Sequence, residues 1–246
     1  MTALTGRVAL VTGGSRGIGR AIALRLAEDG ADIALTYAAA ADRALDVVAG
    51  IEAVGRRGLA IQADLTGAGA AAESVATTVA RFGRLDILVN NAGVFHGGAP
   101  EETSIQAVDE TLDLHVRAVF LAVRAAIPHL GEGGRIISIG SSLAERVPYP
   151  GVSLYAMSKS ALVGLTRGLA RDLGPRGVTA NLVHPGSTDT DMNPADGEDA
   201  ELERSFTALG RYNGPEDVAN TVAHLAGPCG RNITGASITV DAGATA

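Results

Sequence analysis

Residues Val11–Gly19 read V-T-G-G-S-R-G-I-G, and this glycine-rich turn is the strongest single indication of the fold. It follows a short apolar run that begins near Arg7, and it leads into a helical pattern over Ile18–Asp29. A glycine turn between a first strand and a helix lets the backbone approach a pyrophosphate, whose charge meets the N-terminus of the helix. The spacing is G-x-x-x-G-x-G rather than G-x-G-x-x-G, so the indication depends on the position between strand and helix.

The same alternation of short apolar runs and helical patterns continues along the chain. Strands are expected near residues 7–12, 32–37, 58–63, 85–90, 135–141, 178–184 and 236–240. Helices are expected near residues 18–29, 42–54, 70–82, 104–130, 153–173 and 215–226. Apolar strands that alternate with helices predict a parallel sheet that is buried on both faces. We therefore predict one α/β domain over residues 1–246, with a doubly wound, seven-stranded parallel sheet and helices on both faces.

The composition argues against several partners and sites. The formal net charge is −7 and only 3% of the residues are aromatic, which argues against nucleic acid and anionic membranes as partners. Cys229 is the only cysteine, which excludes an internal disulfide and a cysteine-rich metal site. The histidines His96, His129, His184 and His224 have no metal-ligand spacing, so we predict no metal. Without a recognisable signal peptide or membrane span, we expect a soluble cytoplasmic protein.

A second informative segment is Ser153–Leu173, in which apolar residues recur at helical spacing. Tyr155 and Lys159 are four residues apart, so they share one face of this predicted helix. Lys159 is the only lysine in the chain. Arginine does not replace lysine where a compact ammonium must lie beside a reacting group. A solvated surface lysine would fit this segment equally well, and only the other motifs favour a functional role.

The end of the second strand bears on the choice of cofactor. Dinucleotide folds often place an acid there to bind the ribose 2′-hydroxyl, but this chain has Tyr37 at that position. Arg16, in the glycine turn, suits a 2′-phosphate, although a solvated loop charge would also explain it. Arg43 is a weaker second candidate for the phosphate. We therefore predict NADP(H), with NAD(H) as the alternative.

Polar residues also follow the later strands. Asp64 follows the third strand and Asn90–Gly93 the fourth, where they would line an adenosine pocket or simply form turns and caps. Ser141 and Ser142 end the fifth strand, where a hydroxyl could bind a substrate carbonyl or cap the next loop. No G-x-S-x-G motif surrounds them, which argues against an acyl-enzyme hydrolase. Backbone groups of residues 185–190 could hold a nicotinamide amide.

Residues 187–211 differ in composition from the rest of the chain, and we call them the acidic segment. Seven acidic residues lie between Asp189 and Glu203. A solvated surface loop would explain them. The position after a strand, at the edge where open α/β sheets bind ligands, favours instead a lid beside a substrate site.

Six motifs in order make the chain resemble the short-chain dehydrogenase/reductase superfamily, and more narrowly its 3-oxoacyl-carrier-protein reductase-like members. They are T-G-G-S-R-G-I-G, N-N-A-G, a serine, Y-x-x-x-K, H-P-G-x-x-x-T and T-G-x-x-x-x-V-D-A-G, spread over residues 5–244. The resemblance implies a Rossmann fold, an NADP(H)-dependent oxidoreductase acting on a small carbonyl or alcohol substrate, and a homotetramer.

The resemblance also implies roles for individual residues. Tyr155 would be the general acid or base, and Lys159 would bind the nicotinamide ribose and lower the pKa of Tyr155 toward the working pH. A serine would orient the substrate carbonyl. Ser141 lies 14 residues before Tyr155, whereas the common spacing of 13 would select Ser142. We prefer Ser141, because the strand end fixes its direction.

The chain departs from the family at His115, where the family has an asparagine that helps hold a water in a proton relay to the lysine. Histidine also forms hydrogen bonds and titrates near neutrality, so it could preserve the relay, or it could be a core residue without a role. This departure motivates an alternative, a non-enzymatic NADP(H)-binding sensor or interaction protein.

The remaining expected contacts come from the loops around the site. The cofactor contacts are expected to be Gly13, Ser15, Arg16, Gly17, Ile18, Gly19, Tyr37, Asp64, Leu65, Asn91, Ala92, Gly93, Tyr155, Lys159, Pro185, Gly186, Thr188 and Thr190. The substrate contacts are expected to be Phe95, His96, Val147, Tyr149, Ser187 and Met192, which make a modestly apolar pocket.

Overall fold

The computed structural model describes residues 3–246 and contains one sheet of seven parallel strands in the order β3-β2-β1-β4-β5-β6-β7. The strands are β1 (Val8–Val11), β2 (Asp32–Tyr37), β3 (Gly58–Gln62), β4 (Ile87–Asn90), β5 (Arg135–Ile139), β6 (Thr179–Pro185) and β7 (Ser237–Val240). The register pairs Val11 with Leu35 on one side and with Val89 on the other. The predicted fold class is confirmed.

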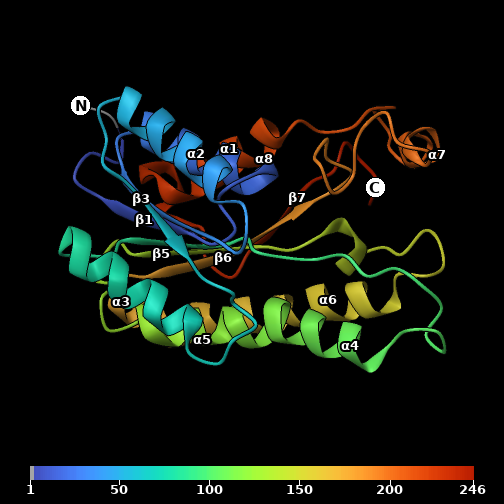
Figure 1. Ribbon diagram of the computed structural model, residues 1–246, viewed down its shortest axis with the longest axis horizontal. Helices are drawn as coiled ribbons and strands as arrows, with labels where there is room; N and C mark the ends of the chain where they lie inside the picture. Colours follow the sequence, from blue (N-terminus) through green and yellow to red (C-terminus); the bar gives the residue numbers. More distant parts are fainter. Residues whose placement is uncertain (1–2) are drawn as a thin grey trace.

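Helices cover both faces of this sheet (Figure 1). One layer contains α1 (Gly17–Glu28), α2 (Ala41–Ala53) and α8 (Pro215–Ala226), and it packs on a core cluster that includes Leu26, Ile33 and Val222. The other layer contains α3 (Ala70–Phe82), α4 (Ile105–Leu112), α5 (Ala118–Ala126) and α6 (Ser153–Leu173). No helix within residues 3–246 is both long and apolar enough to cross a membrane.

The predicted helix over residues 104–130 is interrupted. A π-helical turn, η1 (Asp113–Arg117), lies between α4 and α5, and the Ala118 N–H donates to the Asp113 carbonyl five residues back. The helix also ends at Ala126 rather than at residue 130. Pro128 contributes to this earlier end, because proline has no amide hydrogen to continue the hydrogen bonds of the helix. Turns of the π type often occur at functional sites.

The strand order reverses between β1 and β4, and a crevice opens at such a point in doubly wound sheets. The loops after these two strands touch closely. Gly13 has φ +63°, and a Cβ there would lie 2.9 Å from the Ala92 Cα. The Asn91 Nδ2 donates to the carbonyls of Thr12 at 2.9 Å and Gly13 at 3.1 Å. The N-N-A-G motif therefore braces the glycine turn.

The acidic segment follows β6 and includes the short helix α7 (Ala200–Ser205), which stands away from the two helical layers in Figure 1. A bridge between Thr188 and Asn213 joins its beginning to the chain that follows it. Three 3₁₀ turns complete the fold: η2 (Ser142–Ala144), η3 (Gly174–Arg176) and η4 (Pro228–Asn232).

Candidate active site

A cavity of about 590 Å³ lies between the ends of the central strands and the acidic segment. It is lined by most of the residues expected from the sequence. Of the expected cofactor contacts, these are Gly13, Arg16, Gly17, Ile18, Gly19, Asn91, Ala92, Gly93, Tyr155, Lys159, Pro185, Gly186, Thr188 and Thr190. Ser141, Ser142, Phe95, Tyr149, Ser187 and Met192 line it as well.

Four expected cofactor contacts lie outside this lining: Ser15, Tyr37, Asp64 and Leu65. Ser15 is a buried residue within the glycine turn, and Leu65 belongs to the core cluster that also includes residues of α3 and α5. Tyr37 ends β2 and Asp64 follows β3, farther along the sheet. The Asp64 carboxylate accepts hydrogen bonds from the Thr66 amide at 3.0 Å and from its hydroxyl at 2.7 Å.

Two expected substrate contacts also lie outside the lining. The His96 Nε2 lies 3.1 Å from an oxygen of Glu110 in α4. Val147 is 53% exposed. The sequence showed that both residues belong to loops near the site, but the direction of each side chain depends on its tertiary contacts.

Tyr155 is held by three neighbouring groups. Its ring makes edge-to-face contacts with Phe95, at a centroid distance of 5.1 Å, and with His115, at 5.5 Å. The Lys159 Nζ lies 5.6 Å from the centroid of the same ring. Burial raises the pKa of Tyr155 to about 12, although a hydrogen bond with the Ser141 side chain opposes this rise. The pKa of Tyr155 is therefore raised rather than lowered as the resemblance implied, because burial outweighs the hydrogen bond from Ser141.

Lys159 is 4% exposed, and its Nζ donates to the Ile139 carbonyl at the end of β5 at 3.1 Å. Burial lowers the pKa of Lys159 to about 8, because a cation loses hydration inside the protein. The lysine is therefore a buried group beside Tyr155, not a solvated charge on the helix surface.

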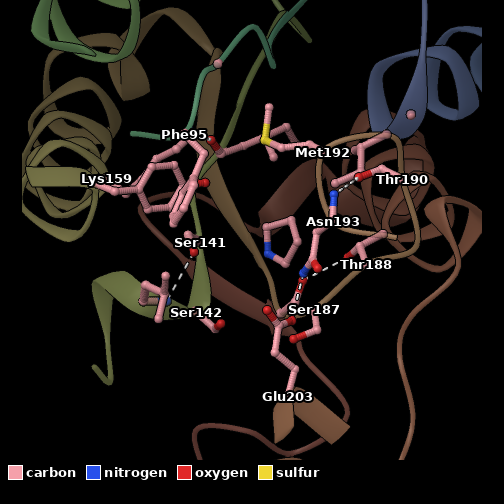
Figure 2. Close-up of a pocket in the computed structure, with 18 of the residues that line it drawn as sticks. Phe95, Ser141, Ser142, Lys159, Ser187, Thr188, Thr190, Met192, Asn193 and Glu203 are labelled. Atoms are coloured by element: carbon pink, nitrogen blue, oxygen red, sulfur yellow. Dashed lines mark hydrogen bonds between the residues drawn. The ribbon is translucent and has the colours of Figure 1, made fainter. Parts of the chain in front are cut away.

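The geometry distinguishes the two candidate serines, which Figure 2 shows on neighbouring positions of the chain. Ser141 is 7% exposed, and its amide donates to the His184 Nδ1 at 3.1 Å. Its side chain accepts from the Leu143 amide at 3.2 Å and shares a hydrogen bond with Tyr155. Ser142 begins η2 and also lines the cavity. The link to Tyr155 favours Ser141.

Sequence reasoning gave no role to His184, which the structure places behind Ser141. The ring is fully buried, and its Nε2 lies 3.5 Å from an oxygen of Glu145. A Cβ at Gly140 would lie 2.5 Å from the His184 Nδ1, so a glycine is required beside the ring. The signal available in the sequence was the position of His184 at the end of the strand that pairs with β5.

His115 lies in η1, behind Tyr155 rather than in the cavity lining. It is 1% exposed. Its Nε2 accepts from the Val94 amide at 3.0 Å, and its Nδ1 lies 2.8 Å from the Ser158 Oγ. Burial, followed by the charge of Lys159, lowers the pKa of His115 to about 2.

The acidic segment forms the opposite wall of the cavity, with Met192, Asn193 and Glu203 directed toward it (Figure 2). The Asn193 Nδ2 donates to Glu203 at 2.7 Å, and the Tyr212 hydroxyl bonds both side chains at 3.0–3.1 Å. Phe206, which sequence reasoning missed, stacks on Tyr149 with ring centroids 5.9 Å apart. The only indication of its role in the sequence was that it is an aromatic residue within the acidic segment.

Two arginines converge on Asp191, which lines the cavity together with Arg16. Arg43 of α2 bonds the Asp191 carboxylate, and the Arg16 Nη1 lies 3.9 Å from the same Asp191 oxygen. The Arg43 hydrogen bond holds the pKa of Asp191 below its usual range. The two guanidinium groups thus share one anion, and that anion belongs to the acidic segment.

The conformation and packing of the glycine turn require glycine at two further positions. Gly17 has φ +52°, and a Cβ at this position would lie 3.2 Å from the Thr190 Cγ2. A Cβ at Gly19 would lie 2.2 Å from the Gly13 carbonyl oxygen. Glycine is therefore required at both positions for the turn to pack against Gly13 and Thr190, and the turn precedes the N-terminus of α1, a position suited to an anionic group. Among residues 3–246, no cluster of three metal-binding side chains occurs.

The sequence and structure match known proteins over nearly their whole length. A family model described as Enoyl-(Acyl carrier protein) reductase matches residues 13–245. A crystal structure of a short-chain dehydrogenase from Burkholderia cenocepacia J2315 in complex with NADP is 59% identical, with a TM-score of 0.99 and full coverage of both chains.

Similar proteins of named function have been assigned different functions. A cyclic-di-GMP-binding biofilm dispersal mediator protein of Escherichia coli K12 is 43% identical and is covered over 98% of each chain. A 3-oxoacyl-[acyl-carrier-protein] reductase of Synechocystis is 40% identical, over 99% of this chain and 98% of the relative.

Proposed function

Because the chain belongs to the short-chain dehydrogenase/reductase superfamily, we propose that it is an NADP(H)-dependent oxidoreductase that interconverts a ketone or aldehyde and an alcohol. One observation carries the proposal: Tyr155, Lys159 and Ser141 converge in the cavity that the glycine turn also lines. A tyrosine, a buried lysine and a strand-end serine supply a proton donor, a cation and a hydrogen-bond donor at one position.

The glycine turn fits the pyrophosphate of the cofactor, because Gly13, Gly17 and Gly19 line the cavity at the N-terminus of α1. Arg16 and Arg43 fit the 2′-phosphate that distinguishes NADP(H) from NAD(H), since both already converge on the Asp191 carboxylate. The NADP complex of the Burkholderia cenocepacia relative supports this preference. When bound, the nicotinamide supplies the hydride.

The residues of the chain handle the proton and the charge. With a pKa of about 12, Tyr155 keeps its proton at neutral pH, which suits proton donation to the oxygen of a carbonyl under reduction. The Ser141 hydroxyl stabilises the negative charge that develops on the same oxygen. The Lys159 ammonium lies beside the Tyr155 ring, where its charge favours the phenolate that proton donation leaves.

The cavity lining favours an uncharged substrate with a flat or apolar part. The chain has only eight phenylalanines and tyrosines in total and no tryptophan. Four of them line the cavity, namely Phe95, Tyr149, Tyr155 and Phe206. Glu198, Asp199 and Glu203 also line it and would repel an anionic substrate. We therefore propose a neutral aryl or alkyl ketone rather than a polyanionic thioester.

The test uses NADPH, a panel of neutral and anionic carbonyl compounds, and absorbance at the nicotinamide band. We expect Tyr155→Phe to lower turnover at least about 100-fold, the usual contribution of a general acid. Tyr212→Phe removes the same atom from a tyrosine outside the cavity lining, and it should have a far smaller effect. Full turnover by Tyr155→Phe would refute the mechanism.

The alternative is a non-enzymatic protein that binds NADP(H) and acts as a sensor or through a partner. The replacement at His115 motivates it, and the intact set of Ser141, Tyr155 and Lys159 weighs against it. Tight NADPH binding without turnover of any carbonyl in the panel would favour this alternative.

We further propose a homotetramer assembled through α4, α5 and α6, with the acidic segment as a substrate lid. Ile105, Phe120 and Met157 expose large apolar side chains on these helices, at 74%, 54% and 53%. Light scattering that gave the mass of a monomer would refute the assembly.

A further inference from the structure

The hydrogen bonds around His115 determine which of its nitrogens carries a proton. The Val94 amide donates to Nε2 at 3.0 Å, so Nε2 acts as an acceptor. The Ser158 hydroxyl donates its only hydrogen to the Tyr155 carbonyl at 2.7 Å. The Ser158 oxygen can then only accept from the His115 Nδ1, which lies 2.8 Å away. His115 is therefore a neutral imidazole with its proton on Nδ1.

The surroundings of the ring disfavour a second proton. His115 is 1% exposed, and Ser158 is fully buried. The titratable groups that face it are Lys159 and Tyr155 of α6 and the more distant His96, whose ring pairs with Glu110 of α4. None of these places a carboxylate against the imidazole, and the Lys159 charge repels an imidazolium. Both ring nitrogens are engaged, one as acceptor and one as donor.

The same ring connects three parts of the site. It lies in η1, it holds the loop after β4 through Val94, and it holds α6 through Ser158 and the Tyr155 carbonyl. The imidazole of His115 also contacts the Tyr155 ring edge to face, with an angle of 82° between the two ring planes. The Phe95 ring, from the residue after Val94, contacts the Tyr155 ring with an interplanar angle of 63°. The position of Tyr155 therefore depends on His115 both directly and through the Val94–Phe95 loop.

The packing leaves little room for any other arrangement. A Cβ at Gly93 would lie 3.0 Å from the His115 Nε2 and 3.6 Å from the Lys159 Nζ. The loop backbone thus passes close to both groups. The π-helical turn places the imidazole in this gap between the loop and α6.

We infer that His115 is a positioning residue, a permanently neutral support that fixes Tyr155 and Phe95, and that its imidazole moves no protons to or from Lys159. The inference depends on the proposed function only for its kinetic test. A positioning role differs from a proton relay, because a relay through the imidazole would require one ring nitrogen to exchange its hydrogen-bond partner during turnover.

The first test is spectroscopic and needs no substrate, so it is independent of the proposed activity. Nitrogen NMR of the full chain, labelled at its five histidines, reports the protonation of each ring nitrogen, and His115→Gln assigns the signal. We expect a protonated Nδ1, an unprotonated Nε2 and no titration from about pH 5.5 to 9.5, a range that spans ordinary imidazole titration. A His115 signal that titrates in this range, or a proton on Nε2, would overturn the inference.

The second test compares variants on an accepted carbonyl. Ser158→Ala removes the acceptor of the Nδ1 proton, and we expect kcat to fall about tenfold, with the KM for NADPH within about twofold. In His115→Ala we expect a larger fall in kcat. His115→Gln should recover a large part of that fall, because the oxygen of its side-chain amide can still accept a hydrogen bond from the Val94 amide. The exposed His129→Asn is the matched control and should leave both constants unchanged.

The pH profile separates positioning from proton transfer. The apparent pKa of kcat should be the same in the parent, His115→Gln and Ser158→Ala. A midpoint displaced by more than about half a pH unit would show that the imidazole takes part in proton transfer, and it would refute the inference. If His115→Ala does not fold, the Ser158→Ala profile still decides the question.

Discussion

The two walls of the cavity are held by opposite kinds of interaction. Behind Tyr155, the wall formed by η1 and α6 consists of buried groups: His115 is 1% exposed and Lys159 4%. Across the cavity, the acidic segment is attached at Asp191, whose side chain is 52% exposed, to Arg16 and Arg43, which are 59% and 56% exposed. The first wall is held by buried hydrogen bonds, whereas the contacts of Asp191 on the second wall are exposed ion pairs.

This difference has consequences for motion. A buried donor that loses its acceptor costs the full desolvation of that group, so the first wall keeps one geometry. Exposed ion pairs contribute little to stability and are screened by salt, so in the proposed lid the Asp191 contacts would add little to the cost of opening. Proton transfer needs fixed positions, whereas substrate entry needs a movable wall. Each wall therefore has the interactions that its proposed task requires.

The largest effect is expected from substituting Lys159, the buried cation of the first wall. Lys159→Met should abolish measurable reduction and at the same time raise the free energy of unfolding at pH 7. Burial lowers the pKa of Lys159 from 10.5 to about 8, which corresponds to a cost of up to about 3 kcal/mol for keeping the charged form buried. The hydrogen bond to Ile139 and the packing of the stem reduce the net gain below this limit.

The pH dependence gives the control for this prediction. Below about pH 8 the lysine is charged in both folded and unfolded chains, so the parent bears the full cost. Between about pH 8 and 10.5 the unfolded chain binds more protons, and the stability of the parent rises with pH. Urea unfolding should therefore show that the advantage of Lys159→Met shrinks from pH 7 to pH 10.5. An advantage of equal size at both pH values would contradict the assignment.

An intermediate effect is expected from substituting Arg16, which contacts Asp191 of the second wall and is proposed to bind the cofactor. Arg16→Ala should weaken NADPH binding about 10- to 100-fold, the range for loss of a charge-assisted hydrogen bond. NADH binding should change less than about twofold, because NADH lacks the 2′-phosphate. Calorimetric titration of both cofactors measures this, with the exposed Arg20→Ala as the matched control. Equal losses for the two cofactors would assign Arg16 to the pyrophosphate instead.

The smallest effect is expected at Asp191. Because its carboxylate occupies Arg16 and Arg43, Asp191→Asn should tighten NADPH binding about two- to threefold at low salt. The gain should disappear at high salt, where such pairs are screened. Asp196→Asn makes the same charge change at an exposed site in the acidic segment and should have no comparable effect. Weaker NADPH binding by Asp191→Asn would show that Asp191 supports the cofactor site rather than competing for it.

Much of the fold was predictable because it depends on local periodicity. Apolar runs and helical spacing place α6 at Ser153–Leu173, as the sequence predicts, and they set the parallel sheet. Residues at the ends of parallel strands must meet at one edge, so Ser141 and the glycine turn were expected near one another. The pair Tyr155 and Lys159 follows from four-residue spacing on one helix.

Other features were not predictable, because they depend on contacts between distant parts of the chain. The partners of His115 are 21 and 43 residues away, at Val94 and Ser158. A histidine at this position was compatible with a relay, a support or a core role until those partners were known. The contact between Asp191 and Arg43 spans 148 residues, and nothing in the acidic run indicated it.

The sequence by itself determined the doubly wound sheet, the glycine turn and the helix that carries Tyr155 and Lys159, because backbone periodicity and chain direction are local properties. Only the tertiary structure decided the proton position on His115 and the pKa values of about 12 for Tyr155 and about 8 for Lys159. Protonation depends on how much water each group loses and on which charges lie beside it. Those neighbours come from loops and helices that are far apart in the chain and meet only when it folds.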